Sequence, residues 1–99
     1  MANTQSGYIP RNTSGYLPHN LQFKVDDTEM IAGETVLTIT VNNGVTDLES
    51  VSVDGQEIYP NLADRFSYTI VYNPTSIVIT FNQGVISEQI FKIKYFTNW

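Results

Sequence analysis

From Leu21 onward, hydrophobic and polar residues alternate along most of the chain. The alternation is clearest at residues 35–41, where Leu37, Ile39 and Val41 occupy every second position. A period of two places one face of a β-strand in the interior and the other in solvent. Runs of this kind, separated by turn residues, predict about seven strands, at residues 21–25, 35–41, 49–53, 56–59, 65–72, 76–82 and 88–96.

The turns between these runs are short and use typical turn residues. Asp54 and Gly55 separate two of the runs, which predicts a two-residue hairpin with a type I′ turn. No stretch has the 3.6-residue period of an amphipathic helix. The sequence therefore predicts an all-β fold, a single immunoglobulin-like antiparallel β-sandwich of about seven strands.

The first 20 residues lack this alternation and contain a tandem repeat instead. Residues 5–12 read QSGYIPRN and residues 13–20 read TSGYLPHN, so Ser, Gly, Tyr, Pro and Asn recur at an offset of eight. Pro10 and Pro18 favour extended backbone in the residues before them and disfavour a helix. We therefore expect an extended N-terminal arm at residues 1–20 and a β-sandwich domain at residues 21–99.

The arm is the strongest candidate for a binding element. Its Tyr8, Ile9, Tyr16 and Leu17 have no evident place in the sandwich core. Two equivalent docking sites raise avidity through effective concentration, and a proline-fixed backbone lowers the ordering cost of binding. The alternatives are an arm that packs back on its own domain as an irregular strand, or a disordered tail. The candidate partner-binding residues are Ser6, Gly7, Tyr8, Ile9, Pro10, Arg11, Asn12, Ser14, Gly15, Tyr16, Leu17, Pro18, His19 and Asn20.

Composition narrows the classes of partner. The formal net charge of −5 disfavours a protein that binds by neutralising phosphates, so we expect no nucleic-acid partner. The sequence has no cysteine, and hence no disulfide framework. It begins without the basic and apolar regions of a signal peptide and has no apolar run of membrane-spanning length, so we expect no membrane partner.

Catalytic and metal-binding patterns are weak. A catalytic triad needs a base beside its nucleophile, and the single histidine, His19, lies in the arm, so we expect no enzymatic activity. No His or Cys spacing suits a metal. Asp26, Asp27 and Glu29 could offer oxygens to calcium, but the stretch lacks the spacing and the glycine of an EF-hand, and a solvated loop is the simpler interpretation. We expect no cofactor.

Carbohydrate binding is the main alternative to docking by the arm. It would require exposed aromatic side chains on one sheet, for which Tyr59, Tyr72 and Trp99 are the candidates.

A short, acidic, cysteine-free sandwich with an extended N-terminal arm resembles the small accessory proteins of tailed-phage virions, namely immunoglobulin-like decoration, auxiliary capsid and head-fibre base proteins. The resemblance is one of architecture. It implies a non-enzymatic protein that decorates or cements a capsid, with a protein lattice such as a major capsid protein as partner. It also implies a place in the virion after assembly in the host cytoplasm. Self-association through the arm is a further expectation, and a carbohydrate-binding or adhesin-type module is the alternative.

Overall fold

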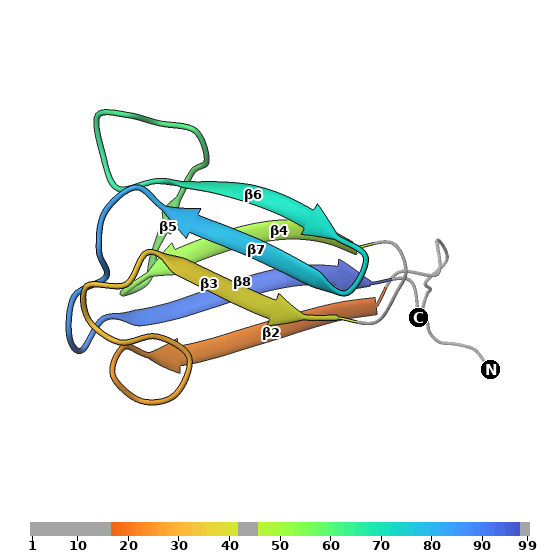
Figure 1. Ribbon diagram of the computed structural model, residues 1–99, viewed down its shortest axis with the longest axis horizontal. Coiled ribbons are helices and arrows are strands. Elements are labelled where there is room, and N and C mark those ends of the chain that lie inside the picture. The colour runs from red at the N-terminus through yellow and green to blue at the C-terminus, as the bar shows by residue number, and fades with distance from the viewer. Residues whose placement is uncertain (1–16, 42–45, 98–99) are drawn as a thin grey trace.

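The computed structural model of the chain describes residues 17–41 and 46–97. These residues form two antiparallel β-sheets packed face to face (Figure 1). One sheet has the strand order β2-β8-β4-β5 and the other the order β3-β7-β6. The strands are β2 (Leu17–Lys24), β3 (Val36–Thr40), β4 (Thr46–Val53), β5 (Gln56–Ile58), β6 (Tyr68–Asn73), β7 (Ser76–Phe81) and β8 (Ile90–Thr97). The prediction of an all-β sandwich with about seven strands is confirmed.

Alternation along the sequence does not reveal the strand order. The consecutive strands β6 and β7 pair as a hairpin within the three-stranded sheet, and the first strand pairs with the last. This pairing differs from the ABED and CFG sheets of an immunoglobulin constant domain, so the likeness lies in the packing of two sheets. Within the described residues there is no helix long and apolar enough to cross a membrane.

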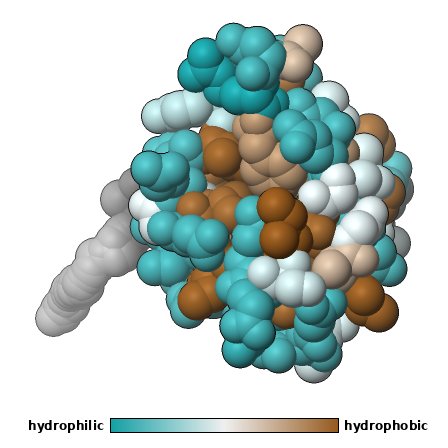
Figure 2. All heavy atoms as spheres, turned by 90° about the vertical axis from the view of Figure 1, so that its left-hand side faces the viewer, coloured by the Kyte–Doolittle hydropathy of each residue, from teal (hydrophilic) through white to brown (hydrophobic). Residues whose placement is uncertain are grey.

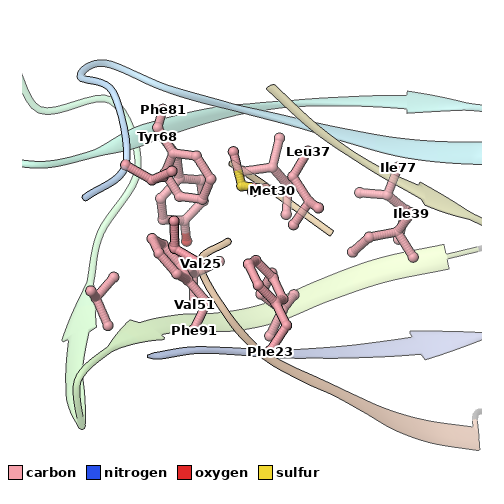
Figure 3. Packing of buried hydrophobic residues seen from close by; sticks show 14 of the residues in the cluster. Phe23, Val25, Met30, Leu37, Ile39, Val51, Tyr68, Ile77, Phe81 and Phe91 are labelled. Carbon is pink, nitrogen blue, oxygen red and sulfur yellow. The ribbon is translucent and has the colours of Figure 1, made fainter. Parts of the chain in front are cut away.

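Hydrophobic side chains from the inner faces of both sheets form one core (Figure 3). Phe91 of β8 is fully buried, with its ring centroid 5.4 Å from that of Phe23 and 5.2 Å from that of Phe81. Phe81 belongs to the opposite sheet, so this aromatic cluster joins the two layers. The buried hydrophobic residues are Phe23, Val25, Met30, Leu37, Ile39, Val41, Val51, Val53, Tyr68, Ile77, Ile79, Phe81, Val85, Phe91 and Ile93.

The hairpin between β4 and β5 has the predicted turn. Asp54 and Gly55 both have positive φ angles, 51° and 87°, and they join the paired residues Val53 and Gln56. Two consecutive positive φ angles are the mark of a type I′ turn, whose twist matches that of the flanking strands. The prediction from the Asp-Gly pair is confirmed.

Three strands begin three or four residues away from the predicted positions. β2 begins at Leu17 rather than Leu21, because β8 continues to Thr97 and residues 17–20 pair with residues 94–97. β4 begins at Thr46 rather than at residue 49, and its register shifts at a bulge between Leu48 and Ser50.

The third difference is β6, which begins at Tyr68 rather than at residue 65. The Ser67 amide donates to Asn82 Oδ1 at 3.0 Å, and Asn82 Nδ2 donates to the carbonyl of Arg65 at 2.7 Å. These side-chain bonds take up backbone groups that a strand ladder would otherwise use, and so hold the preceding residues in a loop.

Candidate interaction surfaces

The structure describes only the last part of the predicted arm. Leu17, Pro18, His19 and Asn20 form the beginning of β2 and are therefore part of the sandwich. The other candidates lie outside the described residues: Ser6, Gly7, Tyr8, Ile9, Pro10, Arg11, Asn12, Ser14, Gly15 and Tyr16.

His19 is fixed to the body of the domain by two contacts with β8. Its Nε2 lies 2.7 Å from Oγ1 of the buried Thr97, and the imidazole tautomer sets which of the two atoms donates the hydrogen bond. Its ring stacks on that of Tyr95, with centroids 5.0 Å apart and planes 14° from parallel. The side chain of His19 is therefore engaged within the chain.

Pro18 occupies the kind of position that an edge strand allows. The Val25 amide donates to the carbonyl of Gln89, which marks the odd-numbered residues of β2 as those bonded to β8. The nitrogen of Pro18 therefore faces the open side of β2, where its missing N–H costs no ladder bond.

The outer face of the four-stranded sheet carries all three lysines of the chain. Lys24 lies on β2, and Lys92 and Lys94 lie on the central strand β8. Lys92 pairs with Gln22 on one side and Ser52 on the other. The only ion pair within the described residues joins Arg65 and Asp64, so no carboxylate there pairs with these lysines.

A shallow trough follows this lysine-bearing face. It has a volume of about 620 Å³. Polar side chains from all four strands line it, among them Gln22, Ser50, Ser52, Glu57, Lys92 and Lys94. The trough presents ammonium, hydroxyl, amide and carboxylate groups side by side, a set of groups that suits a hydroxylated ligand.

The outer face of the three-stranded sheet has the opposite character. The outward residues of its strands carry no charge: Val36, Thr38, Thr40, Thr69, Val71, Asn73, Ser76, Val78 and Thr80. The two faces of the sandwich therefore differ sharply in electrostatic character.

The end of the sandwich opposite the start of β2 exposes hydrophobic side chains among hydrophilic ones (Figure 2). Ile31 and Ile86, from two of the loops at this end, are each 64% exposed. A hollow of about 300 Å³ lies there between the β4–β5 hairpin and the loop that precedes β8, with Phe66 and Ile58 in its wall.

Asp26, in the acidic loop that follows β2, joins this loop to the loop that precedes β8 by hydrogen bonds. Asp26 Oδ1 accepts a hydrogen bond from the Ala32 amide at 2.8 Å, and Oδ2 accepts one from Ser87 Oγ at 2.7 Å. These bonds, the Ala32 bond first, hold the pKa of the Asp26 carboxyl below its ordinary value. No three acidic, histidine or cysteine side chains of the described residues gather as a metal site would require.

The aromatic candidates for carbohydrate binding do not form one platform. Tyr59 and Tyr72 are both exposed, but Tyr59 lies beside the Pro60–Tyr68 bridge at the start of β6, and Tyr72 lies near the end of that strand. The Tyr72 hydroxyl accepts a hydrogen bond from the Leu48 amide at 2.9 Å. Trp99 lies outside the described residues.

Sequence reasoning missed two features that the fold creates. The lysine-bearing face had a visible signal, because all three lysines occupy polar positions of predicted strands. The open edges of the sheets had none, because an edge is defined by strand order. Comparison of the chain with protein-family models, curated proteins and solved structures finds no match.

Proposed function

We propose that the chain is a non-enzymatic structural protein that decorates or cements a virion shell. In this proposal its N-terminal repeat docks on a protein lattice such as a major capsid protein. The supporting observation is that the last four residues of the second copy, 17–20, form the beginning of β2, where His19 contacts Thr97 and Tyr95. The repeat therefore joins the domain at an ordered strand.

The ordered beginning of β2, residues 17–20, favours binding by the residues that precede it for a physical reason. Ordering a flexible connection costs about 1–2 kcal/mol of backbone entropy for each residue. Residues 17–20 are already ordered by their ladder with β8, so a partner that binds the preceding residues need not order them. Docking through the repeat then uses more of its contact energy for affinity.

The test is co-sedimentation with purified shells of the system that encodes the chain. We expect the full-length protein to sediment with the shells, and a chain that begins at Leu17 to remain in the supernatant. A Tyr8→Ala/Tyr16→Ala chain should behave like the shortened one. The shortened chain keeps the whole of β2, so circular dichroism should show an intact sandwich.

A matched control separates the arm from the lysine-bearing face. Lys92→Ser/Lys94→Ser alters the trough alone, and we expect this chain to sediment like the full-length protein. Sedimentation of the shortened chain at the full-length level would refute docking through the arm.

The trough supports a second candidate function, a carbohydrate-binding or adhesin-type module. Its volume lies within the range of about 300–1,000 Å³ that is common for small-ligand sites, and its hydroxyl, amide and ammonium groups suit a sugar. Calorimetric titration with oligosaccharides tests this function. Binding that persists in the chain beginning at Leu17 but is lost in Lys92→Ser/Lys94→Ser would favour this candidate over docking by the arm.

A further inference from the structure

Strand β3 presents an open edge whose backbone groups can be assigned. The Phe81 amide donates to the Thr35 carbonyl at 2.7 Å, and the Val41 amide donates to the Thr75 carbonyl at 2.9 Å. These bonds mark the odd-numbered residues around β3 as those bonded to β7, because bonded positions alternate in an antiparallel ladder. Val36, Thr38 and Thr40 therefore turn their N–H and C=O groups away from β7.

Nothing in the described part of the chain covers this edge. β3 has no neighbour on that side in its sheet, and no backbone hydrogen bond from a described loop or turn reaches Val36, Thr38 or Thr40. The strand contains no proline, charged residue or bulge, the devices by which edge strands normally avoid pairing with other chains.

Two of the other three edges carry a recognised protection, and the third is partly covered. β2 carries Pro18 and Lys24, and β5 is only three residues long. The first residue of β6 is covered, because the Asn61 amide donates to the Tyr68 carbonyl at 2.9 Å. β3 is therefore the edge best suited to accept an added strand.

The repeat supplies a segment with the right pattern for such a strand. In the second copy, the backbone N–H and C=O groups of Leu17 and His19 point toward β8, while the nitrogen of Pro18 points away. The first copy has the same order in Ile9, Pro10 and Arg11. As an added strand it could bond through residues 9 and 11, with the nitrogen of Pro10 turned to solvent.

We propose that residues 9–12 of one copy add as a strand to the β3 edge of a second copy. This inference rests on the proposed role of the arm in docking and names a second copy of the chain as one of its partners. Residues 13–16 link this segment to Leu17, and the steps from residue 12 to Leu17 can extend about 17 Å, enough to reach a copy that packs beside the start of β2. Arg11 meets no positive charge on the outward residues of β3.

The donor segment and the acceptor edge are different surfaces of the molecule. Their contact is therefore heterologous and builds closed rings or open chains of copies rather than only a twofold dimer. Main-chain hydrogen bonds supply the affinity in this mode of recognition, and the uncharged face that adjoins β3 lets two acidic chains approach.

Proline substitution at the open edge tests the proposal directly. Thr38→Pro removes an outward N–H and leaves the β3–β7 ladder bonds in place. Gln22→Pro is the matched control, because the Gln22 amide faces the open side of β2 in the same way. Circular dichroism and thermal unfolding establish that both chains fold.

The readout is molecular mass by sedimentation equilibrium over a series of concentrations. We expect the full-length protein and Gln22→Pro to associate, and Thr38→Pro and the chain beginning at Leu17 to require at least about tenfold higher concentration. A full-length protein that is monomeric throughout, or a Thr38→Pro chain that associates normally, would overturn the inference.

Cysteine pairs distinguish a neighbouring copy from the same copy, since the natural sequence has no cysteine. A mixture of Arg11→Cys chains and Thr38→Cys chains should form a disulfide-linked heterodimer. Arg11→Cys mixed with Ser52→Cys, on the opposite sheet, should not. An internal disulfide in a chain carrying both Arg11→Cys and Thr38→Cys, with no heterodimer in the mixture, would show that the arm folds back on its own β3.

The lattice assay keeps the two proposals apart. If the full-length protein is monomeric but sediments with shells, the proposed function stands and this inference fails. If the chain beginning at Leu17 sediments with shells like the full-length protein, the proposed docking on the shell through the arm is refuted.

Discussion

Phe91 is one of the two residues on which the aromatic packing of the core converges, and Phe81 is the other. The Phe91 ring contacts aromatic rings from both sheets and is fully buried. We expect Phe91→Ala to lower the free energy of unfolding by about 3–5 kcal/mol, because it removes buried apolar area and leaves a cavity. Urea unfolding measures the loss. Val71→Ala, at an exposed position, should change the same quantity by less than about 0.5 kcal/mol.

Asp26 makes the stability of the loop after β2 depend on pH. A carboxyl whose folded pKa is lowered contributes stability at and above its ordinary pKa of 3.8 and loses it as the pH falls through the folded pKa. We expect Asp26→Asn to be less stable than the natural protein at neutral pH, and the difference to shrink below about pH 3.8.

Thermal unfolding at several pH values measures this difference. Asn tolerates the positive φ of 79° at position 26, so the substitution removes the charge without straining the backbone. Asp27→Asn, in the same loop, is the control. A difference that stays constant down to pH 2 would contradict the assigned role of the Asp26 carboxylate.

His19 shows what sequence reasoning could not settle at the level of a residue. The repeat groups it with the arm, and only the pairing of β2 with β8 shows that its partners are Thr97 and Tyr95. Those residues lie more than 70 positions along the chain, and no local pattern joins them. Asp54 and Gly55 are the opposite case, because a turn is a local structure and two residues were enough to predict it.

At the scale of elements, the Asp54–Gly55 turn depends on the backbone freedom of glycine. Gly55 has a φ of 87°, and a Cβ added there would meet no atom within 4 Å. The cost of Gly55→Ala is therefore one of backbone conformation alone, about 1–2 kcal/mol in the free energy of unfolding. Gly55→Asn should cost less, since Asn tolerates this region. Equal losses for the two substitutions would point to a packing cause instead.

The beginning of β2 depends on one buried hydroxyl. Thr97→Val keeps the shape of the side chain and removes the hydrogen bond to His19, a loss of about 1 kcal/mol. Hydrogen exchange should quicken at the amides of Leu17 and His19, which are bonded to β8, and stay slow at Phe23. Thr80→Val, at an exposed position, should leave exchange at both places unchanged.

The existence of the strands could be predicted from the sequence, but their ends and partners could not. A period of two shows which side chains face inward, as at Leu37 and Ile39, but it does not show which strand lies alongside. The early start of β2 and the late start of β6 both arise from distant partners, residues 94–97 in one case and Asn82 in the other. The open edge of β3 belongs to the same class, because it follows from strand order.

At the scale of the whole molecule, charge is distributed unevenly. The net charge is −5, yet the lysines lie on one face and the outward residues of the other sheet carry no charge. Copies of an acidic chain repel each other, and salt screens that repulsion over about 10 Å at 0.1 M.

We therefore expect self-association through β3 to strengthen as salt rises from about 20 mM to about 300 mM. Sedimentation equilibrium at the two salt concentrations measures the change. Ligand binding to Lys92 and Lys94 should weaken under the same change, because salt screens attraction as well as repulsion. Association that weakens with salt would point to the lysine-bearing face as the contact.

The antiparallel pairing of β2 with β8 also has a mechanical consequence. A partner that holds the repeat pulls on the chain at Leu17, the first of eight residues paired with β8. Tension along the strand axis loads all of these pairs together in shear, whereas tension across it opens them one at a time from Leu17. The pairing of β2 with β8 would therefore resist force along the strand axis and open progressively under force across it. The angle of pull would decide how long a loaded copy stays folded.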